Sequence, residues 1–515
     1  MVRASIPTLI KQMLKPDFYP HPVSKKIQLV QTHISYVLLT GDYAYKVKKP
    51  VNFGFLDFST LEKRSHFCQE ELRLNFIGAA QLYLEVLPIT QDGEQYHLGG
   101  TKEPVEYALK MHQFPEEGLL STMLEQEKLT ELDVEELGKV VARYHNQTET
   151  NDYIRSFGEV DKVRCSIDEN YELTSKYIGK AQTETQYKET KAYTDRFFTQ
   201  HPQLFVNRIK NDCIRECHGD LHLRNICIWH SQILLFDCIE FNETFRFVDV
   251  MYDIAFTVMD LEARKRKDLA NIFLNTYLEQ TGDWEGLQLL PLYLSRQAYV
   301  RAKVNSFLLD ESEVSVNVKE ESRKIAANYY KQAWSYTKPQ QGKLFLMSGV
   351  SGSGKSTVAR YLSPKLGAIH IRSDAVRKHL ARIPLLKTGS DKLYTDAMSS
   401  KTYNKLLELG IMLATQGFTV ILDAKYDKLN IRADVIAAAK QHQIPLKIIY
   451  CTAPEEILRD RLNRRSGDIT DATANLLSSQ LQNAEPFSDE EKSYLKILDT
   501  TEPRETQLEE VIRSS

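Results

Sequence analysis

The sequence has no uninterrupted run of about 20 apolar residues, the length that an α-helix needs to cross a bilayer. It also lacks the apolar stretch of a secretory signal, because charges and prolines interrupt the segment from Met1 to Val23. Cysteine is scarce: the seven cysteines are an odd number, which is typical of a chain in a reducing compartment. We therefore expect a cytoplasmic protein with no membrane partner.

An excess of one charge is absent as well, since 66 Lys and Arg residues oppose 69 Asp and Glu residues. The net charge of −3 gives no reason to expect nucleic acid as a partner, although a balanced total can hide a local basic patch.

Internal repeats and low-complexity tracts are also missing. A chain of 515 residues is too long for one hydrophobic core, so two or three domains are expected.

Four of the cysteines lie close together in the sequence: Cys213, Cys217, Cys227 and Cys238. Their spacing matches no paired zinc-ligand pattern, and two of them lie within apolar, strand-like runs. Buried free thiols are the favoured interpretation, with a structural zinc site as the alternative.

The pattern of apolar residues changes near residue 340. The earlier part starts with short β-branched and aromatic runs, such as Tyr43–Lys48, and then becomes mostly helical. A polar linker with proline and glycine covers residues 338–342. After it, buried apolar strands alternate with helices, which is typical of an α/β domain with a mainly parallel sheet. The predicted domains are residues 1–337 and 343–515.

The clearest motif in the second domain is a P-loop that follows an apolar strand and opens a helix. Its glycines let backbone N–H groups turn towards phosphate oxygens, and the helix N-terminus favours the same anion. Lys355 is expected to reach the β- and γ-phosphates, and the Ser356 hydroxyl to hold Mg²⁺. The nucleotide-binding set predicted here is Gly349, Gly352, Ser353, Gly354, Lys355, Ser356 and Thr357.

Three further features of this domain suggest a phosphoryl-transfer enzyme. Asp374 and Arg377 lie three residues apart at a helix start, so they share one face, where Asp374 can accept a hydroxyl proton and Arg377 can bind phosphate. An N-cap with a solvated arginine is the alternative interpretation. Asp423 ends an apolar strand, the place of a Mg²⁺-linked Walker-B acid. The arginines of a later helix can close over phosphates or form a solvated face: Arg459, Arg461, Arg464 and Arg465.

Together these residues resemble the small P-loop kinases that include zeta toxins, gluconate kinases and phage polynucleotide kinase, over about residues 343–503. The resemblance implies that Asp374 activates the acceptor, that Arg377 is the arginine following it, and that Arg461 and Arg464 are lid arginines. It does not name the acceptor.

In the first domain, Asp220 and Asn225 are separated by four residues, the catalytic-loop spacing of protein-kinase-like enzymes. In that arrangement the aspartate deprotonates the acceptor hydroxyl and the asparagine holds a metal ion. Asp237 ends a strand twelve residues after Asn225, where the second metal ligand is expected. Upstream, Lys46 and a glutamate of the following helix, Glu70, form a plausible pair that positions ATP phosphates. Lys48 shares the strand face of Lys46, and Glu71 adjoins Glu70, so both choices stay open.

This domain looks like the aminoglycoside phosphotransferase and choline kinase superfamily, over about residues 25–335, and most closely like the bacterial group in which such a domain precedes a P-loop kinase. The resemblance implies a bilobal α+β fold, Asp220 as base, and Asn225 and Asp237 as metal ligands. A glycine-rich loop between the first two strands is missing, which is a departure from the kinase pattern. Three basic residues of a late helix can bind an anionic acceptor or form a plain basic face: Arg296, Arg301 and Lys303.

The sequence therefore predicts a bifunctional phosphotransferase that uses ATP and Mg²⁺ in both domains and phosphorylates a hydroxyl of a small molecule. Three alternatives remain. The first domain can be a regulatory pseudokinase, the second can be a nucleic-acid end kinase or a toxin, or the chain can be an ATP-driven switch that binds a protein partner.

Overall fold

The computed structural model describes residues 6–23, 26–312, 314–465 and 467–513, and the chain forms two compact units. The first unit holds the chain up to Ala263 together with Leu290–Thr337. The second holds Arg264–Leu289 and the chain from Lys338 onward. The break after Thr337 falls where the linker was expected. The grouping of residues 264–289 with the second unit differs from the two contiguous domains expected, and residues 1–5 of the expected first domain lie outside the described range.

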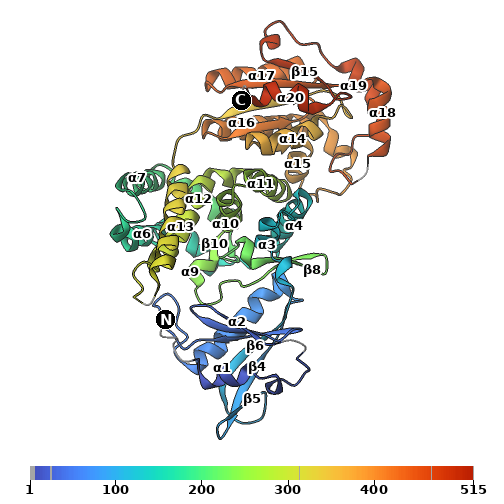
Figure 1. Ribbon diagram of the computed structural model, residues 1–515. Coiled ribbons are helices and arrows are strands. Elements are labelled where there is room, and N and C mark those ends of the chain that lie inside the picture. The colour runs from blue at the N-terminus through green and yellow to red at the C-terminus, as the bar shows by residue number, and fades with distance from the viewer. Residues whose placement is uncertain (1–5, 24–25, 313, 466, 514–515) are drawn as a thin grey trace. The chain divides into compact units, whose positions relative to one another are not determined.

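A six-stranded sheet opens the first unit, and β4, β5 and β6 of this sheet are labelled in Figure 1. The strand order is β1-β2-β3-β6-β4-β5, and neighbouring strands are antiparallel. Its strands are β1 (Gln28–Gln31), β2 (Ser35–Leu39), β3 (Tyr43–Lys48), β4 (Tyr83–Asp92), β5 (Gln95–Leu98) and β6 (Pro104–His112). Side chains alternate across the sheet, so Tyr45 and Val47 of β3 join the apolar cluster of α1 (Thr8–Met13). Lys46 and Lys48 point to the opposite face, towards α2 (Leu61–Ala79).

The rest of the first unit is mainly helical. Its longer helices are α4 (Glu131–Gln147), α6 (Val160–Thr174), α7 (Glu184–Gln200), α8 (Pro202–Lys210), α10 (Val250–Ala263), α12 (Leu290–Phe307) and α13 (Val316–Ser335); α3 (Leu120–Glu125), α5 (Asp152–Arg155) and α9 (Glu243–Arg246) are short. Two short antiparallel pairs support the loops of the candidate site: β7 (Ile214–Glu216) with β10 (Phe247–Asp249), and β8 (Ile226–Trp229) with β9 (Gln232–Leu235). No helix in the described part of the chain combines the length and apolar character that a bilayer span requires.

The second unit contains a five-stranded, wholly parallel sheet with the order β12-β13-β11-β14-β15. Its strands are β11 (Lys343–Ser348), β12 (Ile369–Arg372), β13 (Thr419–Asp423), β14 (Leu446–Thr452) and β15 (Leu495–Asp499). Its longer helices after the linker are α14 (Lys355–Leu366), α15 (Ser373–Leu380), α16 (Asp396–Thr415), α17 (Leu429–Gln441), α18 (Glu455–Arg464) and α20 (Arg504–Arg513), and α19 (Leu477–Asn483) is shorter. This arrangement agrees with the predicted α/β domain.

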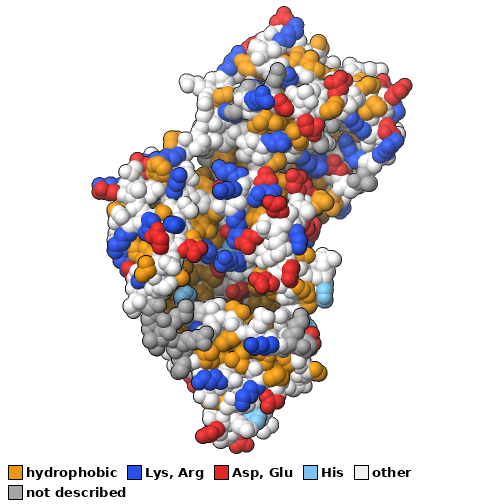
Figure 2. Space-filling model, in the orientation of Figure 1, with side chains coloured by type: hydrophobic (Ala, Val, Ile, Leu, Met, Phe, Trp, Pro, Cys, Tyr) orange, Lys and Arg blue, Asp and Glu red, His pale blue; other side chains and the backbone are white. Residues whose placement is uncertain are grey.

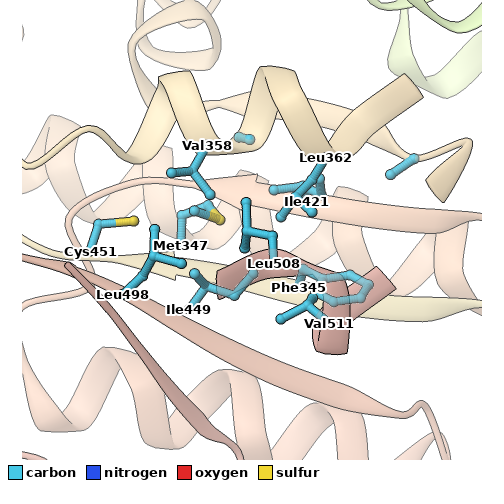
Figure 3. Close-up of a cluster of buried hydrophobic side chains, with 12 residues drawn as sticks. Phe345, Met347, Val358, Leu362, Ile421, Ile449, Cys451, Leu498, Leu508 and Val511 are labelled. Atoms are coloured by element: carbon cyan, nitrogen blue, oxygen red, sulfur yellow. The ribbon is translucent and has the colours of Figure 1, made fainter. Parts of the chain in front are cut away.

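A cluster of buried apolar side chains joins α14 and α20 to this sheet (Figure 3). Phe345 and Met347 of the central strand β11 lie beside Val358 and Leu362 of α14 and Leu508 of α20. The strand is buried along nearly its whole length, as expected for a parallel strand covered on both faces. The cluster therefore fixes the start of α14, and with it the P-loop, against the sheet.

The helix α11 (Lys267–Thr281) covers the edge strand β12, although its sequence lies between two helices of the first unit. Asn275 acts as a substitute for a neighbouring strand. Its Nδ2 donates to the carbonyl of Ala368 at 2.9 Å, and its Oδ1 accepts from the backbone N–H of His370 at 2.7 Å. Asn271 Nδ2 donates to the same carbonyl at 3.0 Å. Side chains of α11 thus form hydrogen bonds with backbone groups that an edge strand would otherwise leave unpaired.

Replacing Asn275 with Ala is expected to destabilise the second unit by about 1–3 kcal/mol, because it leaves a backbone N–H of the edge strand without its acceptor. Hydrogen exchange at His370 and denaturant unfolding of the full chain measure the loss. Gln280→Ala, on the same helix, is the matched control and should stay near the wild type. Equal stability of the two variants would show that the asparagine does not support the edge.

Candidate functional sites

The candidate site of the first unit is built around the carboxylate of Glu71, which is fully buried on α2. Its Oε1 accepts from Lys46 Nζ at 2.7 Å, and its Oε2 accepts from Lys48 Nζ at 2.7 Å. Lys46 also donates to Asp237 Oδ1 at 2.6 Å, and Lys48 pairs with the buried Glu240. One carboxylate therefore holds two strand lysines, and each lysine extends to an acid of the loop after β9.

The contacts differ between the two lysines and between the two glutamates that the sequence left open. Lys46, rather than Lys48, contacts the expected metal ligand Asp237. Glu71, and not the expected Glu70, contacts the strand lysines, because Glu70 faces the other side of α2 and pairs with Arg73 at 2.8 Å. Consecutive residues of a helix point about 100° apart, so only one of the two can reach β3.

The helix α2 also holds the loop that carries Asp237. The amide Oδ1 of Asn75 accepts from the backbone N–H of Cys238 at 3.0 Å, and the hydroxyl of Tyr83 accepts from that of Asp237 at 3.1 Å. Asp237 itself has a φ of +63°, a conformation that a non-glycine residue adopts only when its surroundings hold it there. Burial opposes its ionisation, but Lys46 and Lys48 outweigh burial, so the pKa of Asp237 lies below its usual value.

Asp220 and Asn225 lie together, as their spacing predicted. Asn225 Nδ2 donates to Asp220 Oδ2 at 3.1 Å and to the Asp220 carbonyl at 3.0 Å. The backbone N–H of Phe236 donates to the carbonyl of Asn225 at 3.0 Å, which places the asparagine beside the loop of Asp237. The Asp220 carboxylate keeps partial exposure, so it is accessible to a substrate.

Buried groups fix the turn that carries Asp220. Asp253 accepts from the backbone N–H groups of His218 and Gly219, at 3.2 and 2.8 Å, and from His145 at 3.0 Å. His218 Nε2 donates to the Phe236 carbonyl at 2.8 Å, and burial lowers the pKa of this imidazole. The predicted structural role of His218 agrees with these contacts, because the neutral ring joins the two loops that carry Asp220 and Asp237.

In the second unit, the P-loop joins β11 to α14 with three glycines at positive φ: Gly349, Gly352 and Gly354. At Gly349 a Cβ atom would lie 2.4 Å from the carbonyl of Cys451, so a side chain does not fit there. Lys355 Nζ donates to the Val350 carbonyl at 2.8 Å, and burial lowers the pKa of this lysine. The loop folds back over its own lysine, as a phosphate-binding loop does.

A cleft of about 1360 Å³ opens in front of this loop. Most of the predicted site residues of this unit line it: Gly352, Gly354, Lys355, Ser356, Thr357, Asp374, Arg377, Asp423, Arg461 and Arg464. Gly349 and Ser353 do not line the cleft, because they form the buried base of the loop. The structure therefore brings residues from four parts of the sequence to one cleft.

Asp423 lies at the carboxyl end of β13, and its Oδ2 accepts from His370 Nε2 at 3.0 Å. Burial opposes ionisation here, but His370, Arg372 and Lys355 outweigh it, so the pKa of Asp423 lies well below its usual value. Asp374 behaves differently. Burial raises its pKa, although Arg377 and Arg372 favour the charged form. Arg377 Nη1 lies 3.3 Å from Asp374 Oδ1, and its Nε is buried without a hydrogen-bond partner.

Sequence reasoning missed Arg372, which lines the cleft and is buried at the end of β12. Its guanidinium pairs with Glu279 of α11 at 3.2 Å and with Asp468. The apolar, strand-like pattern around Arg372 gave no signal for this role, because both acids are remote in sequence. A helix from outside the P-loop domain sequence therefore contributes a charge beside the cleft.

The arginines of α18 divide into two kinds. Arg461 is held in place by the hydroxyl and carbonyl of Thr500, at 2.7 and 2.8 Å, next to the P-loop. Arg464 pairs only with Asp460 at 2.8 Å, and its side chain is 80% exposed. Arg459 pairs with Glu455 on the helix surface. Arg461 is pre-positioned, whereas Arg464 is free to turn into the cleft.

Both sites offer donors that suit Mg²⁺. Carboxylate, amide and hydroxyl oxygens are the ligands this ion prefers. In the first unit these are the side chains of Asn225 and Asp237, which adjacent loops present together. In the second they are the Ser356 hydroxyl and the ionised carboxylate of Asp423, which line the same cleft.

Replacing Glu71 with Gln is expected to destabilise the first unit by roughly 3 kcal/mol, because the buried ammonium of Lys48 and the partly buried ammonium of Lys46 lose a shared counter-charge. Glu70→Gln, one residue away, removes only a half-exposed pair and should cost less than about 1 kcal/mol. Denaturant unfolding gives both values, and hydrogen exchange in β3 assigns the loss to the first unit. Similar losses in the two variants would contradict the central role of Glu71.

Comparison with known proteins agrees with the P-loop geometry. Residues 344–487 match a family described as an AAA domain. Among solved structures, a gluconokinase from Sinorhizobium meliloti is 22% identical and covers 34% of this chain and 91% of its own, with a TM-score of 0.26. A choline/ethanolamine kinase family protein from Mesorhizobium loti is 7% identical and covers 64% of this chain and 99% of its own, with a TM-score of 0.37.

Longer matches come from two uncharacterized proteins, one from Mycobacterium tuberculosis and one from Mycobacterium bovis. Each is 31% identical over 466 residues, which cover 89% of this chain and 91% of the relative. The match is long enough to include both units. The chain therefore belongs to the family of these uncharacterized mycobacterial proteins.

Proposed function

We propose that each unit transfers the γ-phosphoryl group of ATP to a hydroxyl of a small molecule. One observation carries this proposal: each unit places an aspartate beside groups suited to bind phosphate and a metal ion. In the first unit this is the partly exposed Asp220, and in the second it is Asp374, which lines the cleft. Phosphoryl transfer needs little more than such positioning and charge neutralisation.

In the first unit, Lys46 is the group that binds the phosphates of ATP, and Glu71 orients it. Mg²⁺, when bound by Asn225 and Asp237, neutralises charge on the phosphates. Asp220 accepts the proton of the acceptor hydroxyl while the hydroxyl oxygen forms a bond to the γ-phosphorus. The bond from that phosphorus to the bridging oxygen breaks, and ADP leaves.

In the second unit, the P-loop N–H groups and Lys355 bind the phosphates, and Asp374 takes the proton of the acceptor hydroxyl. The buried, unsatisfied Nε of Arg377 supports a role in binding the acceptor or the transferred group. Arg461 is already held beside the P-loop, and Arg464 supplies further positive charge on closure.

The alternatives receive less support. A pseudokinase role for the first unit leaves unexplained why Asn225 binds Asp220 and lies beside the loop of Asp237. Acidic and basic side chains are intermixed on the face shown in Figure 2, which favours a small acceptor over a nucleic-acid end. A protein-binding switch does not require the pair of Asp374 and Arg377 in the cleft.

The proposal is tested by incubating the full chain with γ-labelled ATP and a small-molecule cell extract, and by identifying the labelled products by mass spectrometry. Asp220→Ala and Asp374→Ala are each expected to lose a distinct product or step, because each removes one base. Losses of at least about 100-fold are expected for removal of a positioned general base.

Asp161→Ala and Asp396→Ala remove exposed acids from the same two units and serve as controls that keep all products. If Asp220→Ala labels the same products as the wild type, the first unit is a binding module and the bifunctional proposal fails. If no acceptor is labelled while ATP is slowly hydrolysed, the switch is the better interpretation.

The Asp374-dependent reaction is expected to lose rate on the acid side at a pH above the range of an ordinary aspartate. Burial raises the pKa of Asp374, and the base is active only when ionised. Arg377→Gln removes a charge that favours ionisation, so its residual activity should decline at a still higher pH. The control Arg459→Gln should leave the profile unchanged. A profile that stays in place or moves to lower pH in Arg377→Gln would contradict this assignment.

A further inference from the structure

Arg296 lies in the middle of α12 and is only 8% exposed. The basic residues of this helix look alike in sequence, but the structure separates them. Arg301 is partly exposed and lies over the ring of Tyr329, 5.9 Å from its centroid. Lys303 donates to Asn170 Oδ1 at 2.5 Å. Arg296 instead points into the body of the first unit, where it lies over the ring of Tyr252 at 4.3 Å.

Arg296 has no counter-charge among the described residues. No carboxylate lies within the 4.0 Å of an ion pair, and its Nε is buried without a hydrogen-bond acceptor. The other buried arginines of this unit are each paired with an acid: Arg64 with Glu106, Arg208 with Asp249, and Arg246 with Glu216. An ionised group buried alone is costly, so its presence suggests that the partner comes from outside the chain.

Two small cavities adjoin this guanidinium. One, of about 30 Å³, has Lys162, Ser166, Thr244, Tyr252 and Tyr293 in its wall, and the other, of about 10 Å³, has Asn170 and Thr194. Because roughly 10–15 Å³ of such space holds one water molecule, the larger cavity accommodates a group of two to three heavy atoms. The wall combines apolar side chains with hydroxyl groups and the Arg296 guanidinium. Its acid, Asp249, is already bound by Arg208 through both oxygens.

The cavity lies close to the catalytic loop. Its wall includes Ile214 of β7 and Phe247 of β10, the pair from which that loop emerges. Tyr252 directly precedes Asp253, the residue that holds the backbone of His218 and Gly219. Burial raises the pKa of Tyr252. The charge of Arg296 lowers this pKa, and the charges of Asp253 and Asp220 raise it further. Tyr252, which lines this cavity, thus lies within electrostatic reach of Asp220.

We propose that Arg296 binds a carboxylate group carried by the acceptor of the first unit. This inference rests on the proposed kinase function of that unit and adds the class of its substrate. An anionic group supplies the missing counter-charge, fits the larger cavity and accepts hydrogen bonds from the guanidinium. The uncompensated charge of Arg296 disfavours polycationic acceptors.

The test measures anion binding apart from catalysis. Both nucleotide sites of the full chain are first filled with Mg²⁺ and a non-hydrolysable ATP analogue, so that added anions do not bind to the P-loop or to Lys46. Acetate is then titrated by calorimetry. Arg296→Gln is expected to weaken acetate binding at least tenfold, whereas Arg301→Gln, on the same helix, keeps wild-type affinity.

Thermal unfolding separates ligand binding from a structural role. Without added anion, Arg296→Met should have a Tm at or above that of the wild type, because an uncompensated charge is removed. The bound anion should raise the Tm of the wild type and leave that of Arg296→Met unchanged. A lower Tm with an unchanged response to acetate, or acetate binding that does not depend on Arg296, would overturn the inference.

The inference and the proposed function fail in different ways. Asp220→Ala should bind the anion like the wild type, because Asp220 acts only in the reaction. If Asp220-dependent products form but their acceptors carry no carboxylate group, the kinase function stands and the role of Arg296 is wrong. If anion binding depends on Arg296 but no product depends on Asp220, the binding site stands and the kinase function of this unit falls.

Discussion

The carboxylate of Glu71 is the contact on which the first site depends, because it holds two lysines of one strand at once, Lys48 buried and Lys46 partly buried. Each of these lysines then binds a different acid of the loop after β9, Asp237 or Glu240. An alternating chain of three acids and two bases thus joins the sheet, α2 and the loop that carries Asp237. Such a chain tolerates burial because every charge in it has an opposite neighbour, so its geometry is far better defined than that of a surface pair.

The second site depends on a contact of another kind, in which a side chain takes the place of a strand. Asn275 pairs with the backbone of β12, and Glu279, one helical turn further along α11, reaches Arg372 at the end of the same strand. The segment that protects the sheet edge therefore also supplies a charge beside the cleft. Because α11 lies in sequence between two helices of the first unit, the P-loop domain is not assembled from one contiguous stretch of chain.

Local sequence patterns predicted much of this structure. The P-loop after β11, the parallel sheet and the short spacing from Asp220 to Asn225 are properties of neighbouring residues, and these predictions agree with the structure. The choice between Glu70 and Glu71 was beyond such patterns, because it depends on the rotation of α2 against β3. The role of Arg372 was missed for the same reason, since its partners Glu279 and Asp468 are about a hundred residues away.

Burial and pairing, rather than residue type, distinguish a functional cation from a structural one. Arg296 and Arg301 occupy the same helix, and a sequence pattern assigns both to one basic stretch. In the structure, Arg301 keeps contact with solvent, which satisfies its charge at little cost, whereas Arg296 gives up water without gaining an acid. A fold retains such a residue only where its charge meets a partner in the working state. The buried arginines paired with Asp249 and Glu216 need no partner from outside, and this difference identifies Arg296 as a group directed at a ligand.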